Sequence, residues 1–409
     1  MQDRELYRQI LGLTAPWEVS RVELKMTEGR VDIWVGHDAG VRWPCPECGT
    51  EFACRDHAEE RTWRHLDTCQ LKTFLHGRVP RVDCPTHGVR QAKVPWAEAH
   101  SRFTLLMERL VIDVLTQCST VSGACRLMRL SWDEAWGVMD RAVSRGLSRK
   151  QRRELAAVGV DEKAFRKGHR YMTLVYDLEG SGVEYVGEER TAAALEAYWN
   201  TLTEAQRGAI RAVAMDMWAP YIQATIKCLP DAHEKIVFDR FHIMSHMLKA
   251  VDTVRKQESR TLAAEGKDTL KGTKYCWLFS RENLPERHQP KFDALMDMNL
   301  KVGRAWAIKE SLRELWRYHS IGWARRFFSR WYFWATHSRL APVIKVARTI
   351  KEHLKNVLTY CRHRVTNAVA EGINSKIMAV VRKACGFRNA EHFKTAIYFY
   401  CGNLDLYPR

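Results

Sequence analysis

The order of apolar runs between residues 156 and 264 constrains the fold more than any other feature of the sequence. Three strand-like segments follow one another, and two strand-then-helix units come after them. The apolar runs of these segments lie at 156–163, 171–177, 182–186, 211–215 and 236–238. Strands in series followed by a β-α-β-α pattern predict a mixed α/β sheet with helices on its faces.

Acidic residues lie within one of these strands and at the ends of two others. Asp161 lies within the first strand, and the alternation of side chains along a strand places Glu162 on the opposite face. Asp216 and Asp239 end the last two apolar runs, at the strand ends where open α/β sheets place their sites. Taken singly, an Asp at a strand end is more often a helix N-cap.

A further carboxylate lies on a predicted helix near the C-terminus. Glu371 falls at the margin of an apolar stripe that includes Val369, Ile373 and Ile377. From that position it can reach over a sheet edge toward Asp161 and Asp216. Three such carboxylates can hold two hard cations about 3.5–4 Å apart, which is the arrangement that cleaves phosphodiesters.

Two short cysteine motifs precede the sheet. Cys45-Pro-Glu-Cys48 and Cys84-Pro-Thr-His87 each aim two ligands from one tight turn, and a glycine follows each motif. The set predicts a tetrahedral Cys₃His zinc site that stabilises a small β-rich module. A redox Cys-x-x-Cys would need a βαβ context that is missing here. The intervening residues are expected to be spectators, although a swapped ligand is possible among Cys54, His57, His65 and Cys69.

Three helical segments follow the cysteine motifs. Residues 104–116 form one, Ser119 or Thr120 can cap a second at 121–128, and Ser131-Trp-Asp-Glu134 is a capping box for a third. Short helices joined by a tight turn, the last ending near Arg141 and Arg145, suit a DNA-binding helix-turn-helix. A plain helical linker is the alternative.

Positive charge is concentrated in the last part of the chain. Residues 251–409 carry 30 basic and 14 acidic side chains, and so hold +16 of the net charge of +17. A polyanionic partner, first of all nucleic acid, is predicted, the alternative being a merely soluble basic surface.

Tryptophans interleave with arginines in the segment 265–345, which we predict to be a helical insertion. Such rings either stack on unpaired bases or pack a small helical core, and we expect the core role for most of them. The residues concerned are Trp306, Trp316, Trp323, Trp331 and Trp334, among Arg313, Arg317, Arg325, Arg326, Arg330 and Arg339.

Taken together, these stretches resemble a DDE transposase of bacterial insertion sequences, of the ISL-three type. That family combines an N-terminal zinc module, a helix-turn-helix and an RNase H-like core. The matching stretches are CPECG, VDCPTHGVR, VGVDEKAFRKGHRYMTLVYDL, AMDMWAPYI, IVFDRFHIMSHML and AEGINSKIMAVVRKACGFRN.

The resemblance implies roles for individual residues. Asp161, Asp216 and Glu371 become a catalytic triad that binds two Mg²⁺ ions, for which Mn²⁺ can substitute, and Asp239 and His242 support the site. The residues implied to face a DNA backbone are Lys163, Arg166, Lys167, His169, Arg170, Asn374, Lys376, Arg382 and Arg388.

The expected organisation is a multidomain α/β chain. Its parts are a zinc-binding module (1–100), a helix-turn-helix domain (101–150), the first part of an RNase H-like core (151–264), the helical insertion (265–345) and the second part of the core (346–409).

The expected function is metal-dependent DNA cleavage and strand transfer at terminal inverted repeats. The expected partner is double-stranded DNA, at both transposon ends and target, bound by a homodimer or larger assembly. The alternatives are an RNase H-like endonuclease or resolvase, and a non-enzymatic zinc and helix-turn-helix regulator. No apolar run typical of a signal peptide or membrane helix is seen, so we expect a bacterial cytoplasmic protein associated with the nucleoid.

Overall fold

The computed structural model describes residues 3–151, 153–166 and 170–409, which divide into two compact units. The first unit contains residues 1–150, 381–386 and 404–409, and the second contains 151–380 and 387–403. Across the described residues, no helix is both long enough and apolar enough to cross a membrane.

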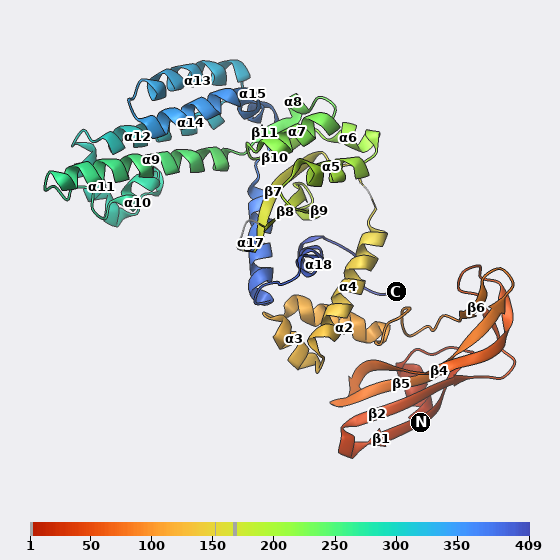
Figure 1. The fold of residues 1–409 in the computed structure, drawn as a ribbon. Helices are drawn as coiled ribbons and strands as arrows, with labels where there is room; N and C mark the ends of the chain where they lie inside the picture. Colours follow the sequence, from red (N-terminus) through yellow and green to blue (C-terminus); the bar gives the residue numbers. More distant parts are fainter. Residues whose placement is uncertain (1–2, 152, 167–169) are drawn as a thin grey trace. The chain divides into compact units, whose positions relative to one another are not determined.

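The first unit begins with helix α1 (Asp3–Ile10) and a six-stranded sheet (Figure 1). Strands β1 and β2 form the hairpin whose turn ends at Gly29, which takes the left-handed conformation with φ of 62°. The strand order is β1-β2-β5-β4-β3, with β6 paired to β5. The strands are β1 (Trp17–Lys25), β2 (Arg30–His37), β3 (Arg42–Pro44), β4 (Glu51–Thr68), β5 (Leu71–Cys84) and β6 (Gly88–Gln91).

Three helices follow the sheet, as predicted: α2 (Leu105–Gln117), α3 (Val121–Met128) and α4 (Trp132–Arg149). Thr104 and Thr120 cap the first two through their hydroxyls, and Ser131 forms the predicted capping box with Glu134. In the turn before α4, Arg129 rather than a glycine takes the left-handed conformation, with φ of 53°.

Two of the three arginines of α4, Arg141 and Arg145, form ion pairs within the unit. The carboxylate of Glu108, 1% exposed, accepts hydrogen bonds from Arg141 and Arg145, and Arg145 also pairs with Glu98. Arg141 and Arg145, at the basic end of the predicted helix-turn-helix, therefore have a structural role in this unit. Their charges are used inside the unit, because a carboxylate buried this deeply is stable only when it is paired.

The second unit is built on the predicted mixed sheet, with strand order β11-β10-β7-β8-β9. β7, β8 and β9 are antiparallel neighbours, whereas β10 and β11 run parallel to β7. The strands are β7 (Ala157–Arg166), β8 (Arg170–Asp177), β9 (Gly182–Glu188), β10 (Ala212–Met215) and β11 (Ile236–Phe238).

Helices connect and cover these strands. Tyr198, Trp199 and Tyr221 pack from the covering helices onto Val158 and Val160 of β7. The connecting helices are α5 (Ala192–Thr201), α6 (Glu204–Ala209), α7 (Ala219–Cys228), α8 (Ala232–Lys235) and the long α9 (Arg240–Ala264).

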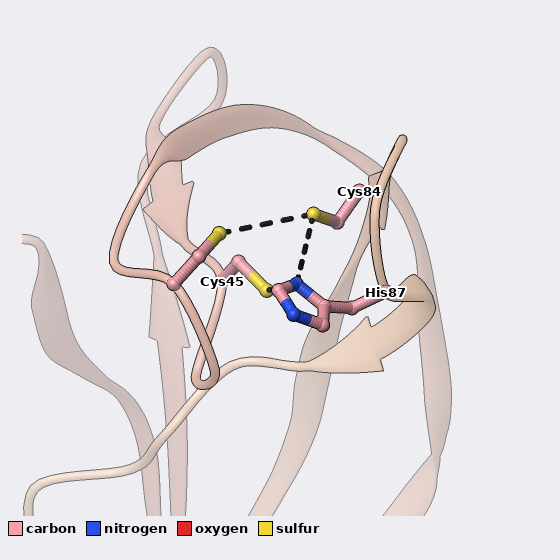
Figure 2. Close-up of side chains that lie close together, drawn as sticks. Cys45, Cys84 and His87 are labelled. Atoms are coloured by element: carbon pink, nitrogen blue, oxygen red, sulfur yellow. Dashed lines mark hydrogen bonds between the residues drawn. The ribbon is translucent and has the colours of Figure 1, made fainter.

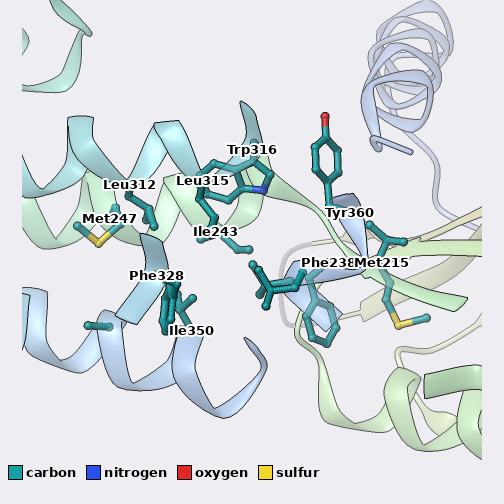
Figure 3. Packing of buried hydrophobic residues seen from close by; sticks show 14 of the residues in the cluster. Met215, Phe238, Ile243, Met247, Leu312, Leu315, Trp316, Phe328, Ile350 and Tyr360 are labelled. Carbon is teal, nitrogen blue, oxygen red and sulfur yellow. The ribbon is translucent and has the colours of Figure 1, made fainter. Parts of the chain in front are cut away.

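The predicted insertion is helical throughout its regular structure. α9 and α14 run side by side (Figure 1), and their apolar residues join the same cluster as the strand residues Met215 and Phe238 (Figure 3). The helices are α10 (Lys274–Leu278), α11 (Gln289–Met296), α12 (Lys301–Arg313), α13 (Ile321–Thr336) and α14 (Ala341–Glu352), with short 3₁₀ turns at Arg281–Asn283, Glu286–His288 and Glu314–Arg317.

The chain then returns to the sheet through α15 (Leu354–Leu358) and α16 (Tyr360–His363), followed by α17 (Ala368–Lys383) and α18 (Ala390–Cys401). The five tryptophans of the insertion divide between two environments. Trp306, Trp316 and Trp331 are buried in the core, whereas Trp323 and Trp334 on α13 are exposed. The expectation that most of them pack a helical core is confirmed.

One buried histidine joins the N-terminal sheet to α2. The Nδ1 of His65 lies 2.9 Å from the Oγ1 of Thr104, the residue that caps α2. Burial, with a smaller contribution from the neighbouring Arg64, lowers the pKa of His65 to about 4.

We predict that acid destabilises the first unit through this side chain. Because the folded state holds His65 neutral, the free energy of unfolding falls as the pH drops from about 6.5 toward 4, by at most about 3 kcal/mol. His65→Gln should flatten this dependence in urea denaturation, and His100→Asn, which removes an exposed imidazole, should keep it. An unchanged slope in His65→Gln would show that another group is responsible.

Candidate active site and zinc centre

The two cysteine motifs converge on one point in the N-terminal sheet. Cys45 and Cys48 flank a turn between β3 and β4, and Cys84 and His87 flank the turn between β5 and β6 (Figure 2). Gly49 and Gly88 follow the two motifs with φ of 76° and 68°, a conformation that side chains disfavour. These glycines let each turn fold tightly enough to aim both of its ligands inward.

The distances between the ligand atoms fit a tetrahedral zinc ion. The Sγ atoms of Cys48 and Cys84 are 3.8 Å apart, and the Nδ1 of His87 lies 3.8 Å from Cys45 Sγ and 3.4 Å from Cys84 Sγ. A tetrahedron with Zn–S bonds of about 2.3 Å has edges of about 3.8 Å. Hydrogen bonds with Thr50 also lower the pKa of the Cys48 thiol to about 6, which favours the thiolate that zinc binds.

In the second unit, parallel pairing brings three aspartates to one level of the sheet. Ala214 on β10 pairs with Gly159 on β7, so Asp216 lies level with Asp161 two residues further on. Met215 pairs with Phe238 on β11, so Asp239 lies level with Asp216. β10, which ends just before Asp216, is the direct neighbour of β7, and β11 lies one strand further out.

On one face of β7, Asp161 meets α17. The Nδ2 of Asn374 donates to Asp161 Oδ2 at 2.7 Å, and the hydroxyl of Tyr176 donates to Asn374 Oδ1 at 3.0 Å. A Cβ at Gly159 would lie 2.9 Å from the Oδ1 of Asn367, so a glycine is needed where the start of α17 approaches the strand. Asn374, predicted to face DNA, thus orients the first aspartate in this structure.

Glu162, the next residue of β7, shares an arginine with Asp216. One Nη2 atom of Arg190 lies 3.0 Å from Glu162 Oε1 and 3.3 Å from Asp216 Oδ2. Burial and the negative charge of Asp216 raise the pKa of Glu162 to about 7, and Arg190 opposes the shift. Sequence reasoning missed Arg190, which lies just before α5 and carries no motif of its own.

Asp239 connects α9 to the start of α17. Its Oδ1 accepts from the amide of Phe241 at 3.3 Å as the N-cap of α9, and the backbone amide of Asn367 also bonds to the carboxylate. The alternative prediction, that this aspartate is a helix N-cap, is therefore correct. Glu371 lies one turn further along α17 and is exposed. Burial raises its pKa, and Asp239 and Asp161 add to the shift.

His242 acts on four of these acids. Burial raises the pKa values of Asp161, Glu162, Asp239 and Glu371, and the imidazole of His242 lowers each of them. His242 lies in the first turn of α9 and is half-buried. The Asp-x-x-His pair of Asp239 and His242 thus lies near Asp161 and Glu371.

The acids are more widely spaced than the ligands of a single ion. Within the described residues, Cys45, Cys48, Cys84 and His87 form the only group of three or more candidate ligands whose atoms all lie within 4.8 Å of one another. Asp161, Asp216 and Glu371 approach from two strands and a helix without forming such a compact set.

The predicted DNA contacts fall into three groups. Lys163 is half-buried on β7. Burial lowers its pKa, and the negative charge of Asp161 partly offsets this shift. Lys167 and His169 lie outside the described residues, and only the backbone of Arg166 is described. The exposed members are Arg170, Lys376, Arg382 and Arg388.

Comparison with known families accounts for this combination. A transposase model of the ISL3 type matches residues 158–397, which include the five carboxylates and His242. The chain belongs to the ISL3 family of transposases. Two further models match in order: the zinc-finger of the transposases of IS204, IS1001, IS1096 and IS1165 at residues 42–87, and the helix-turn-helix domain of the ISL3 family at 92–143.

Curated relatives agree with this assignment over nearly the whole transposase. The transposase for insertion sequence element IS1001 from Bordetella parapertussis is 29% identical over 399 residues, covering 96% of this chain and 97% of the relative. The transposase for insertion sequence element IS1557 from Mycobacterium tuberculosis is 27% identical over 422 residues, covering 96% and 94%. The resemblance inferred from the sequence is confirmed, and the zinc-finger match supports a structural zinc ion at the Cys₃His cluster.

We predict that this ion maintains the first sheet of the transposase. Cys45→Ser should abolish the stoichiometric zinc content and unfold residues 42–91, because a structural site supplies folding free energy directly. Zinc content by elemental analysis and hydrogen exchange of β3 to β6 would measure both effects.

Cys69→Ser is the matched control, since Cys69 lies exposed in the turn between β4 and β5. It should retain zinc and exchange like the wild type. A Cys45→Ser protein with unchanged zinc content would contradict the assigned ligand set.

Proposed function

We propose that this transposase binds the terminal inverted repeats of its insertion sequence, cleaves the DNA at their ends and joins the freed 3′-hydroxyl to target DNA. The helix-turn-helix and the zinc module supply end recognition, and Asp161, Asp216 and Glu371 form the catalytic triad. The observation that carries the proposal is the gathering of acids around His242, beside two parallel strand ends and one helix of the matched transposase region.

The donor set fits Mg²⁺, a hard cation that prefers carboxylate oxygens. Two buried oxygens of the cluster, Glu162 Oε2 and Asp239 Oδ2, have no hydrogen-bond partner among the described residues. Four of the acids also have raised pKa values, which marks negative charge that lacks full compensation. Bound at Asp161, Asp216 and Glu371, two Mg²⁺ ions would supply Lewis-acid activation of the attacking and leaving oxygens of a phosphodiester.

The wide spacing of the acids is compatible with two ions. Ions about 3.5–4 Å apart divide the ligands between them, so the acids need not all lie within one coordination sphere. Asp161 lies on the central strand β7 and Asp216 follows the neighbouring strand β10, so these two residues and Glu371 of α17 would hold the ions.

Other side chains of the cluster position these three. Asn374 fixes the rotamer of Asp161 by donating to one oxygen, and Arg190 restrains Asp216. Asp239 ties the start of α17, and with it Glu371, to the end of β11. The exposed cations Arg170, Lys376, Arg382 and Arg388 bind DNA phosphates.

Pairing of the two transposon ends requires two active sites. A homodimer or larger assembly on DNA follows from this requirement, because one chain carries a single set of the three acids.

The first experiment measures cleavage of a labelled duplex that carries the terminal repeat of the element. We expect Mg²⁺-dependent nicking at the repeat boundary and joining to a target plasmid by the wild type. Asp161→Asn should lower the nicking rate at least about 100-fold, a loss of several kcal/mol of transition-state stabilisation. Nicking without joining would favour an endonuclease or resolvase, and repeat binding with no cleavage in either protein would favour a regulator.

A second prediction separates chemistry from folding at Glu371. Glu371→Gln should abolish cleavage and leave the affinity for the repeat within about twofold, because Glu371 is exposed and supports no buried contact. Ser375→Ala, one turn further along α17, should cleave normally. Loss of repeat binding in Glu371→Gln, measured by gel shift, would assign Glu371 a structural role and remove it from the triad.

A further inference from the structure

A cavity of about 520 Å³ opens between α9 and α14, next to the carboxylates. Its apolar lining comes from both helices and includes Ile243, Ala250, Val346 and Ile350, with Met217 at one end. Ile243 and Ile350 belong to the packed cluster that joins these helices to the sheet (Figure 3). The volume lies in the range of small-ligand sites.

Two lysines supply the positive charge at this cavity, and burial lowers the pKa of the His246 imidazole that also lines it. His246 and Lys249 of α9 and Lys345 of α14 are exposed at the lining, and neither lysine side chain has an ion-pair partner among the described residues. The hydroxyls of Thr253 and Thr349 donate to carbonyls one turn earlier on their own helices, at 2.8 Å and 3.3 Å. No carboxylate of the described chain lines the cavity.

The chain connects this cavity directly to the proposed catalytic residues. Met217 follows Asp216 in sequence, and His246 lies one helical turn after His242 on α9. A DNA strand held with its phosphate at the acids therefore has its neighbouring nucleotide within reach of the cavity.

We propose that this cavity binds an unpaired nucleotide of the DNA strand held at the carboxylates. The base lies on the apolar floor between α9 and α14, and its phosphate lies against Lys249 and Lys345. Apolar walls and a cationic rim match the two parts of a nucleotide, whereas a paired base in a duplex is stacked and cannot enter. The proposal rests on the proposed function, since it takes DNA as the substrate of the adjacent site.

The test compares two labelled duplexes of the terminal repeat, one blunt and one with a short single-stranded tail at the cleavage boundary. Binding is measured without divalent metal in the Asp161→Asn background, so that no cleavage occurs. The wild-type cavity should bind the tailed duplex about 10-fold more tightly than the blunt one. A 2-aminopurine in the tail should change fluorescence as its base leaves water.

Two independent changes should remove this preference. Val346→Trp fills the cavity from a half-buried position, and Lys249→Glu with Lys345→Glu reverses the rim charge without altering the core. Both should bind the tailed duplex no better than the blunt one, with blunt binding retained after Val346→Trp. Lys256→Glu is the matched control for Lys249→Glu alone, because it makes the same charge change on α9 outside the cavity, and it should keep the preference.

Equal affinity of the parent protein for both duplexes would overturn the proposal. So would charge reversal that weakens both duplexes equally while Val346→Trp changes neither, since the lysines would then contact only a duplex backbone. If Val346→Trp fails to fold by circular dichroism, the lysine pair alone decides. The readout needs no catalysis, so a failure of the proposed cleavage reaction and a failure of this site give different results.

Discussion

The parallel pairing of β7, β10 and β11 is the constraint on which the rest of the second unit depends. It places Asp161, Asp216 and Asp239 at one level of three adjacent strands, where their charges repel one another. Burial adds to this cost and raises the pKa values of Asp161 and Asp239. Buried carboxylates this close together are stable only when nearby groups compensate their negative charge. Arg190, Asn374 and His242 supply part of this compensation. The remaining uncompensated charge is what a divalent cation would neutralise.

The helical insertion separates Asp216 from Glu371 in sequence without separating them in the fold. A long insertion costs little loop entropy when it folds on its own apolar surface, because the closure cost grows only slowly with length. Here the apolar residues of α9, α12, α13 and α14 belong to the same cluster as those of β7, β10 and β11. The insertion is therefore packed onto the sheet, and the chain returns to it through Asn356 and Thr359, which both bond the carbonyl of Ile236. Glu371 is then positioned by Asp239, which bonds the amide of Asn367 at the start of α17.

Local features of the sequence were sufficient to predict the strands, the helix caps and the zinc ligands. Thr120 and Ser131 reveal helix starts because a cap acts within three residues, and a Cys-x-x-Cys turn is equally local. The proposed catalytic roles of Asp161, Asp216 and Glu371 came from the resemblance to a family, because a single Asp at a strand end is more often a helix N-cap. The roles of Arg190 and Asn374 could not be predicted, since their partners lie far away in sequence. The same reason explains why the ion pairs of Arg141 and Arg145 were not predicted, since their partner Glu108 is buried on another helix.

A single helix links three features of the proposed site. The N-cap of α9 is Asp239, its first turn carries His242, and its following turns carry His246 and Lys249 at the cavity. A rigid helix fixes the distances between these groups, so the position of a phosphate at the acids determines where the adjacent nucleotide lies. Because α9 also packs against α14 and the strands β10 and β11 through one continuous core, a change in how the insertion packs would move the rim lysines and the site histidine together. If a DNA strand is bound as proposed, α9 and the insertion would help to position it, and residues 251–409, which hold +16 of the net charge, would supply positive charge for that contact.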